Sequence, residues 1–544
     1  MTLKQRILVS VFISIPFVNH AQQSRGLDEQ INDAFMPFAT WWEDFILSTV
    51  TIFGYGIPIV LILLLLGAIF FTVYFGFVNI KHFPTAIQVV RGKYDDLESL
   101  NIETTAQVYE VEGDLVDTIK DESHHGEVNH FQALATAVSG TVGLGNIAMV
   151  AVAISIGGPG ATFWMIIAGL LGMSSKFVEC TLGVTYRDID SDGNVYGGPM
   201  YYLSRGLKER GLVKLGKFLA IVFAILCVGA SFGGGNAFQT NQAAAQIISR
   251  FGIEGAASGS IIGFIFAVVV GIVIIGGIKR IAKITEKVVP VMAVLYVASA
   301  LFIIFSNFSF IDDAIGLIIT EAFTPKATIT GGFIGVMIQG FRRAAFSNEA
   351  GAGSAAIAHA AVNTKYAASE GLVGLLEPFI DTVVVCSMTA IIIVMFNMEG
   401  AFVYGDVING QALLADGSRL GGVNLTSMAF DNAIPGSSYV LVIAVTLFAF
   451  STILSWSYYG LQSWKYLFGR SKWVDLTYKI IFLLFTILGA AITLDAVIKF
   501  SDAMILALVF PNMIGLLLLF PKVRSEMKRY LDAIKTLKSK KATS

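Results

Sequence analysis

The residues best placed to do chemistry lie in a glycine-rich stretch, Ser139–Gly160, within a long apolar segment. Gly140, Gly143 and Gly145 come close together there, and Asn146 follows them directly. Each glycine costs about 1 kcal/mol relative to alanine inside a helix, so we expect the helix to break at this point. In a membrane, unwound backbone survives only where it lines a cavity or is buried in protein, and its carbonyl and amide groups can then bind ligands. The stretch therefore predicts a transport site for a small zwitterion and a monovalent cation.

The composition indicates an all-α membrane protein. Of the 544 residues, 55% are hydrophobic and only 14% are charged, and the mean hydropathy is +0.72. Soluble domains are about 25% charged. Apolar stretches of about 20 residues recur, and each is long enough to cross a bilayer core of about 30 Å. The net charge of −2 suggests no nucleic-acid partner, and the three cysteines fall inside apolar segments, so we expect neither disulfides nor a metal site of Cys and His.

The N-terminal region resembles a signal peptide followed by an external segment. Residues 1–21 combine basic residues with an apolar run, although an uncleaved anchor is the alternative. We expect residues 22–56 to be external and interfacial, and residues 57–78 to form an extra N-terminal transmembrane helix. Residues 79–130 are polar and acidic, which favours a solvated cytoplasmic loop.

Ten further apolar segments follow, which gives eleven predicted spans in all. The first five belong to residues 131–305 and the second five to residues 331–520, with an external loop at 306–330 and a basic cytoplasmic tail at 521–544. We expect the ten spans at Gln132–Ile156, Gly160–Val184, Phe218–Ile248, Gly259–Ile278, Ile284–Phe305, Gly331–His359, Leu372–Met398, Tyr439–Trp464, Thr477–Lys499 and Ala503–Phe520.

The distribution of lysine and arginine predicts the orientation. Basic residues concentrate in alternate loops and in the C-terminal tail, while the intervening loops contain few of them. Cytoplasmic loops carry an excess of Lys and Arg. We therefore expect a multi-pass protein of the plasma (inner) membrane, with a cytoplasmic C-terminus and an external start of the first span.

A second broken segment is predicted at Gly331–His359. Arg342, Arg343 and Glu349 are costly in hydrocarbon, but they are tolerable if the helix breaks near 345–348 and they face a polar interior. Without the extra N-terminal span, the two broken segments are the first and sixth of ten. Interruptions at corresponding positions of two halves indicate an inverted repeat with its binding site near the bilayer midplane.

Several motifs occur in family-like order and spacing over Gly126–Phe520, and through them the chain resembles the alanine or glycine:cation symporter family. The resemblance implies a LeuT-type fold of five plus five helices, and sodium-driven uptake of alanine or glycine by alternating access. It implies no cofactor apart from Na⁺ as the coupling ion. The motifs are Thr141-Val-Gly-Leu-Gly-Asn-Ile-Ala, Gly157-Gly-Pro-Gly, Lys176-Phe-Val-Glu, Tyr196-Gly-Gly-Pro-Met-Tyr-Tyr, Phe346-Ser-Asn-Glu-Ala-Gly-Ala-Gly-Ser, Asp381-Thr and Phe450-Ser-Thr-Ile-Leu-Ser-Trp-Ser-Tyr-Tyr-Gly.

The resemblance also implies a sodium site between the first and eighth core helices. Ser139 and Val142 match the carbonyl donors of the first, and Phe448, Ser451 and Thr452 match the donors of the eighth. The last three are spaced i, i+3 and i+4, so they share one helix face. The alternative is that Ser451 and Thr452 bond to the preceding turn of their own helix.

Substrate contacts are expected at the break itself. Gly143 and Gly145 let the backbone approach a ligand, and Asn146 offers both a donor and an acceptor. Gln239 matches a family position that faces the amino acid, and Trp456 could wall its small side chain. For Trp456 the alternative is a place in the interfacial aromatic belt. For Asn146 and Gln239 the alternative is hydrogen bonding between helices.

The buried charges leave further possibilities open. We expect Glu349 to pair with Arg343 at the second break, and Lys176 to pair with Glu179, its i+3 neighbour. A proton-coupled amino acid carrier on the same scaffold is the alternative function, and it would use Asp381 or Glu349. No placement of His or Cys suggests a nucleophile–base pair, so we expect no enzyme. The expected partners are a small neutral amino acid, Na⁺ and the lipid bilayer.

Overall fold

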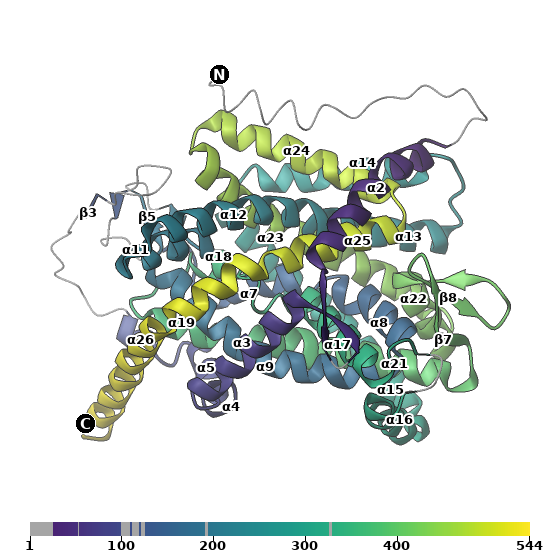
Figure 1. Cartoon of the computed structure of the whole chain (residues 1–544), viewed down its shortest axis with the longest axis horizontal. Coiled ribbons are helices and arrows are strands. Elements are labelled where there is room, and N and C mark those ends of the chain that lie inside the picture. The colour runs from purple at the N-terminus through teal and green to yellow at the C-terminus, as the bar shows by residue number, and fades with distance from the viewer. Residues whose placement is uncertain are drawn as a thin grey trace.

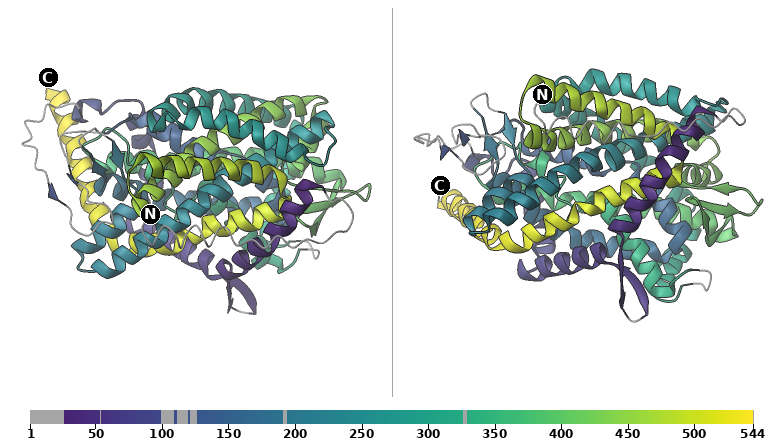
Figure 2. Two further views of the ribbon diagram at one scale, coloured as in Figure 1. Left: turned by 90° about the horizontal axis from the view of Figure 1, so that it is seen from above. Right: turned by 45° about the horizontal axis from the view of Figure 1, so that its top comes forward.

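The computed structural model describes residues 26–52, 54–98, 109–110, 119–120, 126–190, 194–325 and 329–543. The predicted signal peptide, residues 1–21, lies outside the described residues. The long helices run beside one another, mostly along the long axis of the molecule (Figure 1). The C-terminal part of the last helix extends away from the bundle in every view (Figures 1 and 2).

The N-terminal elements pack on the outside of the bundle. Helix α2 crosses α25 (Leu494–Ala507), and parts of the segment expected as a solvated loop fold back onto the bundle, because Ala86 and Val89 of α5 are buried. These elements are α2 (Leu27–Ile46), the antiparallel hairpin β1 (Thr49–Ile52) and β2 (Tyr55–Pro58), α3 (Ile59–Tyr74), α4 (Val78–Lys81), α5 (Phe83–Val90), α6 (Asp95–Glu98), and the short pair β3 (Tyr109–Glu110) and β4 (Ile119–Lys120).

The first half of the bundle begins with a helix that breaks in its middle. Helix α7 (His130–Thr141) and the helical stretch Gly145–Gly157, made of the π-helical turn η1 (Gly145–Met149) and α8 (Val150–Gly157), meet at an angle of 48°. The remaining elements are α9 (Gly160–Thr185), β5 (Asp188–Ile189), β6 (Val195–Tyr196), α10 (Pro199–Tyr201), η2 (Tyr202–Gly206), α11 (Leu207–Glu209), α12 (Val213–Phe232), η3 (Gly233–Ala237), α13 (Phe238–Phe251), α14 (Ser258–Ile274) and α15 (Gly277–Ser306).

The second half contains another interrupted helix. Helix α17 (Gly332–Asn348) stops at Glu349, whose backbone is left-handed with φ 54°, and α18 (Ala356–His359) follows after an irregular turn. The other elements are η4 (Phe308–Phe310), α16 (Ile311–Phe323), α19 (Ala367–Gly374), α20 (Leu376–Pro378), η5 (Phe379–Cys386), α21 (Ser387–Phe396), η6 (Asn397–Glu399), the sheet β7 (Phe402–Ile408), β8 (Gln411–Leu414) and β9 (Arg419–Leu420), α22 (Gly422–Ala433), α23 (Ser437–Phe468), α24 (Lys472–Ala491), α25 and α26 (Val509–Thr543).

One predicted span ends in a different place. We expected a span to run to Lys499, but α24 ends at Ala491 and the chain turns at Ile492, which is extended. Thr493 then caps the next helix by accepting a hydrogen bond from the N–H of Ala496. A threonine at the N-cap satisfies one of the free amides of a new helix, so the apolar run is divided between α24 and α25.

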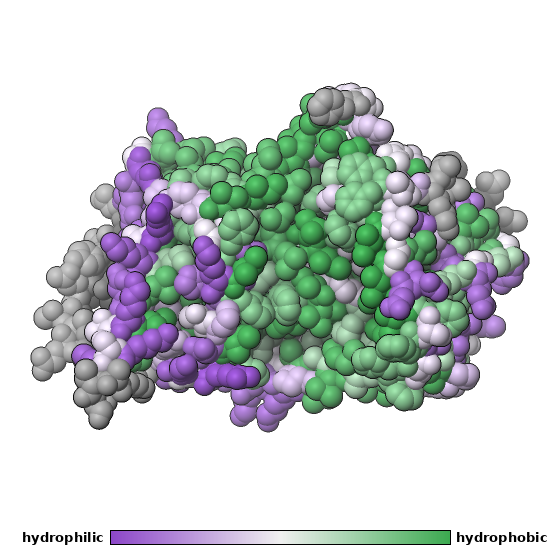
Figure 3. All heavy atoms as spheres, turned by 90° about the horizontal axis from the view of Figure 1, so that it is seen from below, coloured by the Kyte–Doolittle hydropathy of each residue, from purple (hydrophilic) through white to green (hydrophobic). Residues whose placement is uncertain are grey.

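The described part of the chain contains seven helices that are long and apolar enough to cross a membrane, or eight if the bent pair counts as one span. Helices α3 and α14, with 16 and 17 residues, are apolar but shorter. The count of eleven spans and the extra N-terminal helix therefore stay predictions. Figure 3 shows hydrophobic residues over the middle of one face and hydrophilic residues gathered toward its two ends, as expected for a multi-pass membrane protein.

Candidate functional site

The first break is built by glycines and two amide side chains. Helix α7 ends at Thr141, and Val142 leaves the helical conformation with φ −75° and ψ 87°. The N–H of Gly143 donates to Asn146 Oδ1 at 2.9 Å, and the N–H of Leu144 donates to Gln239 Oε1 at 3.0 Å. The backbone amides freed by the break thus have side-chain partners, which makes an unwound turn tolerable in a buried position.

Four of the five residues expected to bind sodium contact one another between α7 and α23. Thr452 Oγ1 donates to the carbonyl of Ser139 at 2.9 Å, and Ser139 Oγ donates to the carbonyl of Ser451 at 2.8 Å. Ser451 Oγ donates to the carbonyl of Phe448 at 3.1 Å. Ser451 therefore bonds to the preceding turn of its own helix, which was the alternative to sodium binding. Thr452 does not, because its hydroxyl donates to the other helix.

Val142, the fifth residue, lies at the edge of this group. A Cβ atom added to Gly143, the next residue, would be 2.5 Å from Thr452 Oγ1, so the backbone after Val142 packs directly on Thr452. The group offers carbonyl and hydroxyl oxygens at the C-terminal end of a half-helix, where the helix dipole is negative. Unwound carbonyls and half-helix C-termini are the groups that bind Na⁺ in many secondary transporters, so the residues fit such an ion.

Asn146 and Gln239 join the break to neighbouring helices. Asn146 Nδ2 donates to Asp381 Oδ1 at 2.6 Å and to the Asp381 carbonyl at 3.0 Å, which ties η1 to η5. Gln239 Oε1 accepts the N–H of Leu144, which ties the break to α13, and Gln239 Nε2 donates to the carbonyl of Gly234 in the preceding turns of its own helical stretch at 2.9 Å. In this conformation Asn146 donates to another helical segment and Gln239 accepts from one, which is the hydrogen bonding between helices that was the alternative to substrate contacts.

Trp456 is a residue of the interior. Its side chain is 1% exposed, it packs on Gly235, and its Nε1 donates to Glu349 Oε1 at 3.2 Å. A place in the interfacial aromatic belt is therefore excluded. Gly145, on the other side of the break, faces the ring of Phe346, which lies 3.5 Å from the position of an added Cβ.

Sequence reasoning missed three residues that contact the break from distant segments. Phe346 covers Gly145, Thr389 Oγ1 donates to the carbonyl of Asn146 at 2.8 Å, and Thr426 Oγ1 donates to the carbonyl of Ile147 at 2.9 Å. Thr389 stands in an apolar run, where its hydroxyl is a signal, whereas Thr426 lies in a mixed polar segment and nothing in the sequence marks it.

The expected pair of Glu349 with Arg343 is wrong. Arg343 Nη1 lies 3.2 Å from Asp502 Oδ1 on α25, and Arg342 Nε lies 2.9 Å from Asp502 Oδ2. The side chain of Glu349 instead accepts hydrogen bonds from Ser354 and Trp456. Glu349 lies beyond the end of α17 in a left-handed turn, so it does not continue the helix face that carries Arg343.

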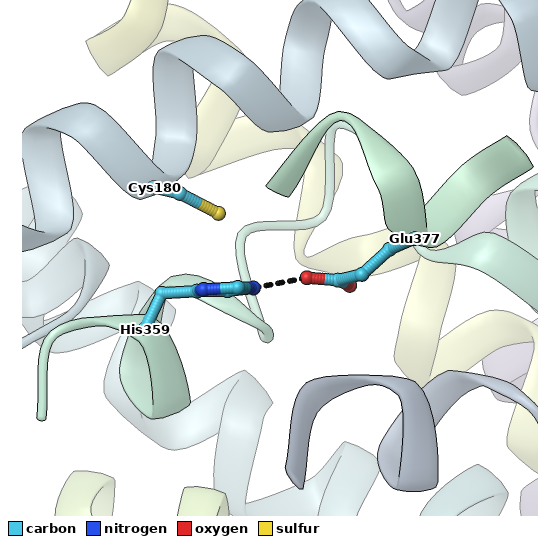
Figure 4. Close-up of side chains that lie close together, drawn as sticks. All are labelled: Cys180, His359 and Glu377. Carbon is cyan, nitrogen blue, oxygen red and sulfur yellow. Dashed lines mark hydrogen bonds and ion pairs between the residues drawn. The ribbon is translucent and has the colours of Figure 1, made fainter. Parts of the chain in front are cut away.

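A buried cluster of charges holds α9, α18, α19 and α20 together. Figure 4 shows Cys180, His359 and Glu377 pointing toward one another, and one ligand-type atom from each lies within 4.8 Å of the others. His359 Nδ1 lies 2.5 Å from Glu370 Oε1, its Nε2 contacts Glu377, and Lys176 Nζ is 3.1 Å from Glu377 Oε2. Because the ammonium of Lys176 and the imidazole of His359 already contact the Glu377 carboxylate, the cluster is better explained as an internal network of hydrogen bonds and an ion pair than as a metal site.

The expected salt bridge of Lys176 to Glu179 is also corrected by this cluster. The salt bridge of Lys176 goes to Glu377, and Glu179 Oε1 accepts from Asn512 Nδ2 at 2.9 Å. Residues i and i+3 on a helix can interact, but a carboxylate from a facing helix competes for the same lysine.

Comparisons with known proteins agree on one family. The model described as "Sodium:alanine symporter family" matches residues 40–544. The sodium/alanine symporter AgcS of Methanococcus maripaludis is 38% identical over 486 residues, which are 89% of this chain and 96% of that protein. The putative sodium/proton-dependent alanine carrier protein YrbD of Bacillus subtilis is 36% identical over 434 residues, 78% of this chain and 85% of that protein.

Among solved structures, MhsT in complex with L-phenylalanine aligns with 74% of this chain and 100% of its own. The TM-score is 0.45 and the sequence identity is 14%.

Proposed function

Because the chain belongs to the sodium:alanine symporter family, we propose that it couples inward movement of Na⁺ to uptake of a small neutral amino acid, alanine or glycine. The family consists of transporters, so the chain is a secondary transporter and not an enzyme. The observation that carries the sodium assignment is the convergence of Ser139, Phe448, Ser451 and Thr452 where α7 ends against α23.

Sodium binding would act on the contact between two helices. The carbonyls of Ser139, Val142 and Phe448 and the hydroxyls of Ser451 and Thr452 would turn toward the ion. When no ion is bound, the hydrogen bond from Thr452 to the carbonyl of Ser139 joins α23 to α7. An ion held by both helices would replace that bond with stronger contacts and fix the geometry of the break.

The substrate would then bind at the start of the half-helix that begins with η1. Its carboxylate would meet the N–H groups of Gly143 and Leu144, where the helix dipole is positive. Those groups now donate to Asn146 and Gln239, so the two amides would turn to the substrate ammonium or be displaced. Trp456 stands one turn after Thr452 on α23 and would limit the size of the side chain.

The energetics of one sodium ion are adequate. A tenfold Na⁺ gradient supplies about 1.4 kcal/mol, and a membrane potential of about 100 mV adds about 2.3 kcal/mol for one charge. Together they could hold a substrate gradient of several hundred-fold, since about 1.4 kcal/mol corresponds to a factor of ten.

Proton coupling is the second candidate, and one contact favours it. Asp381 is fully buried, and its carboxylate accepts a hydrogen bond of 2.6 Å from Asn146 at the break. A proton on Asp381 would change that bond directly. The relative YrbD carries the description "sodium/proton-dependent".

Uptake of radiolabelled alanine into proteoliposomes tests the proposal. An inward Na⁺ gradient is compared with an equal K⁺ gradient, for the wild type, Thr452→Ala and Thr452→Ser. We expect uptake only with Na⁺. Thr452→Ala should need about tenfold more Na⁺, since a lost hydrogen-bonding or ligand group costs about 1–3 kcal/mol, and Thr452→Ser should stay near the wild type.

Equal uptake under both gradients would contradict sodium coupling. In that case Asp381→Asn, measured with a pH gradient, separates the proton-coupled carrier from a passive pathway, because only the former accumulates alanine and loses that ability with the carboxylate.

A further inference from the structure

A cavity lined by both polar and apolar side chains lies at the end of the bundle that carries β7–β9 and α22, opposite the C-terminal end of α26 (Figure 1). Its volume is about 460 Å³, and residues of α13, α21, β9, α22 and α23 line it. Gln246, one of them, is seven residues beyond Gln239 on α13, which corresponds to about 10 Å along the helix. The cavity is therefore separate from the break in α7.

Two opposite charges, Arg250 and Asp431, lie beside each other in the cavity lining and form a loose ion pair. Arg250 Nη1 and Asp431 Oδ2 are 3.5 Å apart, at the limit for a hydrogen bond. The guanidinium of Arg250 lies over the ring of Tyr439, 3.7 Å from its centroid, which fixes its orientation. The Nε atom of Arg250 is buried and has no hydrogen-bond partner among the described residues. A buried N–H group without a partner lacks a hydrogen bond that an anionic group could supply.

The carboxylate of Asp431 is held in place by backbone groups. The N–H of Gly436 donates to Asp431 Oδ1 at 2.8 Å, and that of Ser438 donates to it at 3.3 Å. Partial burial acts to raise the pKa of Asp431, but these hydrogen bonds and the charge of Arg250 outweigh it, so the pKa lies below its ordinary value. Asp431 therefore carries a negative charge at neutral pH.

Two acceptors beside the charges also lack partners. Gln246 Oε1 and Asn424 Oδ1 are buried and accept no hydrogen bond within the described part of the chain. Gln246 is itself 1% exposed, and its Nε2 donates to Ser427 Oγ at 2.8 Å, which leaves only the oxygen available. An ammonium group has three donors, and Asp431 with these two amide oxygens would match them.

The walls of the cavity are joined by a regular series of contacts. Gln242, Gln246 and Arg250 of α13 pair with Val423, Ser427 and Asp431 of α22, at steps of four residues on both helices. Residues four apart lie on one helix face, so the series holds the two helices in register. The Gln246–Ser427 and Arg250–Asp431 pairs both line the cavity, and the Arg250–Asp431 pair is the loosest of the three contacts.

We propose that this cavity is a second binding site for an α-amino acid zwitterion, at the mouth of the transporter and apart from the break in α7. The carboxylate of the ligand accepts two hydrogen bonds from the Nε and Nη groups of Arg250. The ammonium of the ligand donates to Asp431, Gln246 and Asn424. Only the choice of alanine as ligand rests on the proposed function. Thr426 of α22, which is not in the cavity lining, donates to the carbonyl of Ile147 in the half-helix, so α22 contacts both the cavity and the segment that follows the break.

The stoichiometry of binding tests the proposal. Equilibrium dialysis of radiolabelled alanine against the purified full chain in detergent, at saturating Na⁺, should give two equivalents for the wild type. Arg250→Gln and Asp431→Asn should each give one. Arg250→Lys keeps the charge but loses the planar fork, and it should weaken the second equivalent by at least about tenfold.

Arg419→Gln is the matched control. Arg419 pairs with Asp406 at 2.7 Å on the β7–β9 sheet, at the same end of the molecule but outside the cavity lining, so this variant should bind two equivalents. Gel filtration and thermal unfolding show whether each variant is folded. One equivalent in the wild type, or two in both Arg250→Gln and Asp431→Asn, would overturn the second site. No binding at all with Na⁺ would contradict alanine as ligand of both sites.

Discussion

At the scale of single residues, Gly143 lies between a residue expected to bind sodium, Thr452, and a residue expected to bind the substrate, Gln239. A Cβ atom added there would lie 2.5 Å from Thr452 Oγ1 and 3.0 Å from Gln239 Oε1, and both side chains are fixed by hydrogen bonds to buried backbone. We expect Gly143→Ala to lower the initial rate of Na⁺-driven alanine uptake at least tenfold, and stability by about 1–3 kcal/mol through overpacking.

Gly316→Ala is the control for this prediction. Gly316 lies in α16 with nothing within 4 Å of an added Cβ, so uptake and unfolding temperature should match the wild type. A wild-type rate in Gly143→Ala, at equal reconstituted protein, would show that the break tolerates a side chain and that close backbone approach is not needed.

Residue types predicted the break better than they predicted its partners. Glycines beside Asn146 mark an interrupted helix because their helical cost is local and can be read from sequence. The partner of Arg343 is 159 residues away, at Asp502, and only the packing of α17 on α25 brings the two together. For the same reason the spacing between Arg343 and Glu349 gave the wrong pair.

At the scale of elements, Asp502 fastens α25 to α17. It is fully buried and contacts both Arg342 and Arg343, and Arg342 also contacts Glu43 of α2. Asp502→Asn would leave a buried guanidinium without its counter-charge, which costs about 3–5 kcal/mol. We expect a large fall in the unfolding temperature measured in detergent, and loss of uptake with it.

The matched control is Asp495→Asn on the same helix. Asp495 pairs with Lys499 at 2.8 Å, and both side chains are partly exposed, so the change should cost about 0.5 kcal/mol or less. If Asp502→Asn unfolded at the same temperature as Asp495→Asn, the cluster would not be what holds α25 against α17.

Helix ends were harder to predict than helices. Hydropathy alone gives no sign of the turn at Ile492, and the signal in the sequence is Thr493, which caps α25 and is followed by Asp495 in its first turn. Likewise, the acidic composition of residues 79–130 led us to expect a solvated loop and gave no indication of α5, whose short apolar face packs on the bundle. Hydropathy therefore located most of the long helices but not the junctions between them.

At the scale of the whole molecule, the two ends differ in charge and construction. One end carries β7–β9 and α22, and the other carries the basic end of α26, with a hydrophobic middle between them (Figures 1 and 3). Lysine and arginine are retained on the cytoplasmic side of membranes. We therefore expect the α26 end to be cytoplasmic and the β7–β9 end to face outside.

Single cysteines at the two ends test this orientation. Asp416, in the exposed turn before β9, and Lys535, whose side chain on α26 is 78% exposed, are suitable positions. The native cysteines Cys180, Cys227 and Cys386 are all buried, so background labelling should be low. In intact cells, a membrane-impermeant maleimide should label Asp416→Cys fully. It should label Lys535→Cys only after permeabilisation. The reverse pattern would place the cavity between α13 and α22 on the cytoplasmic side, where it would meet amino acid leaving the transporter instead of amino acid arriving.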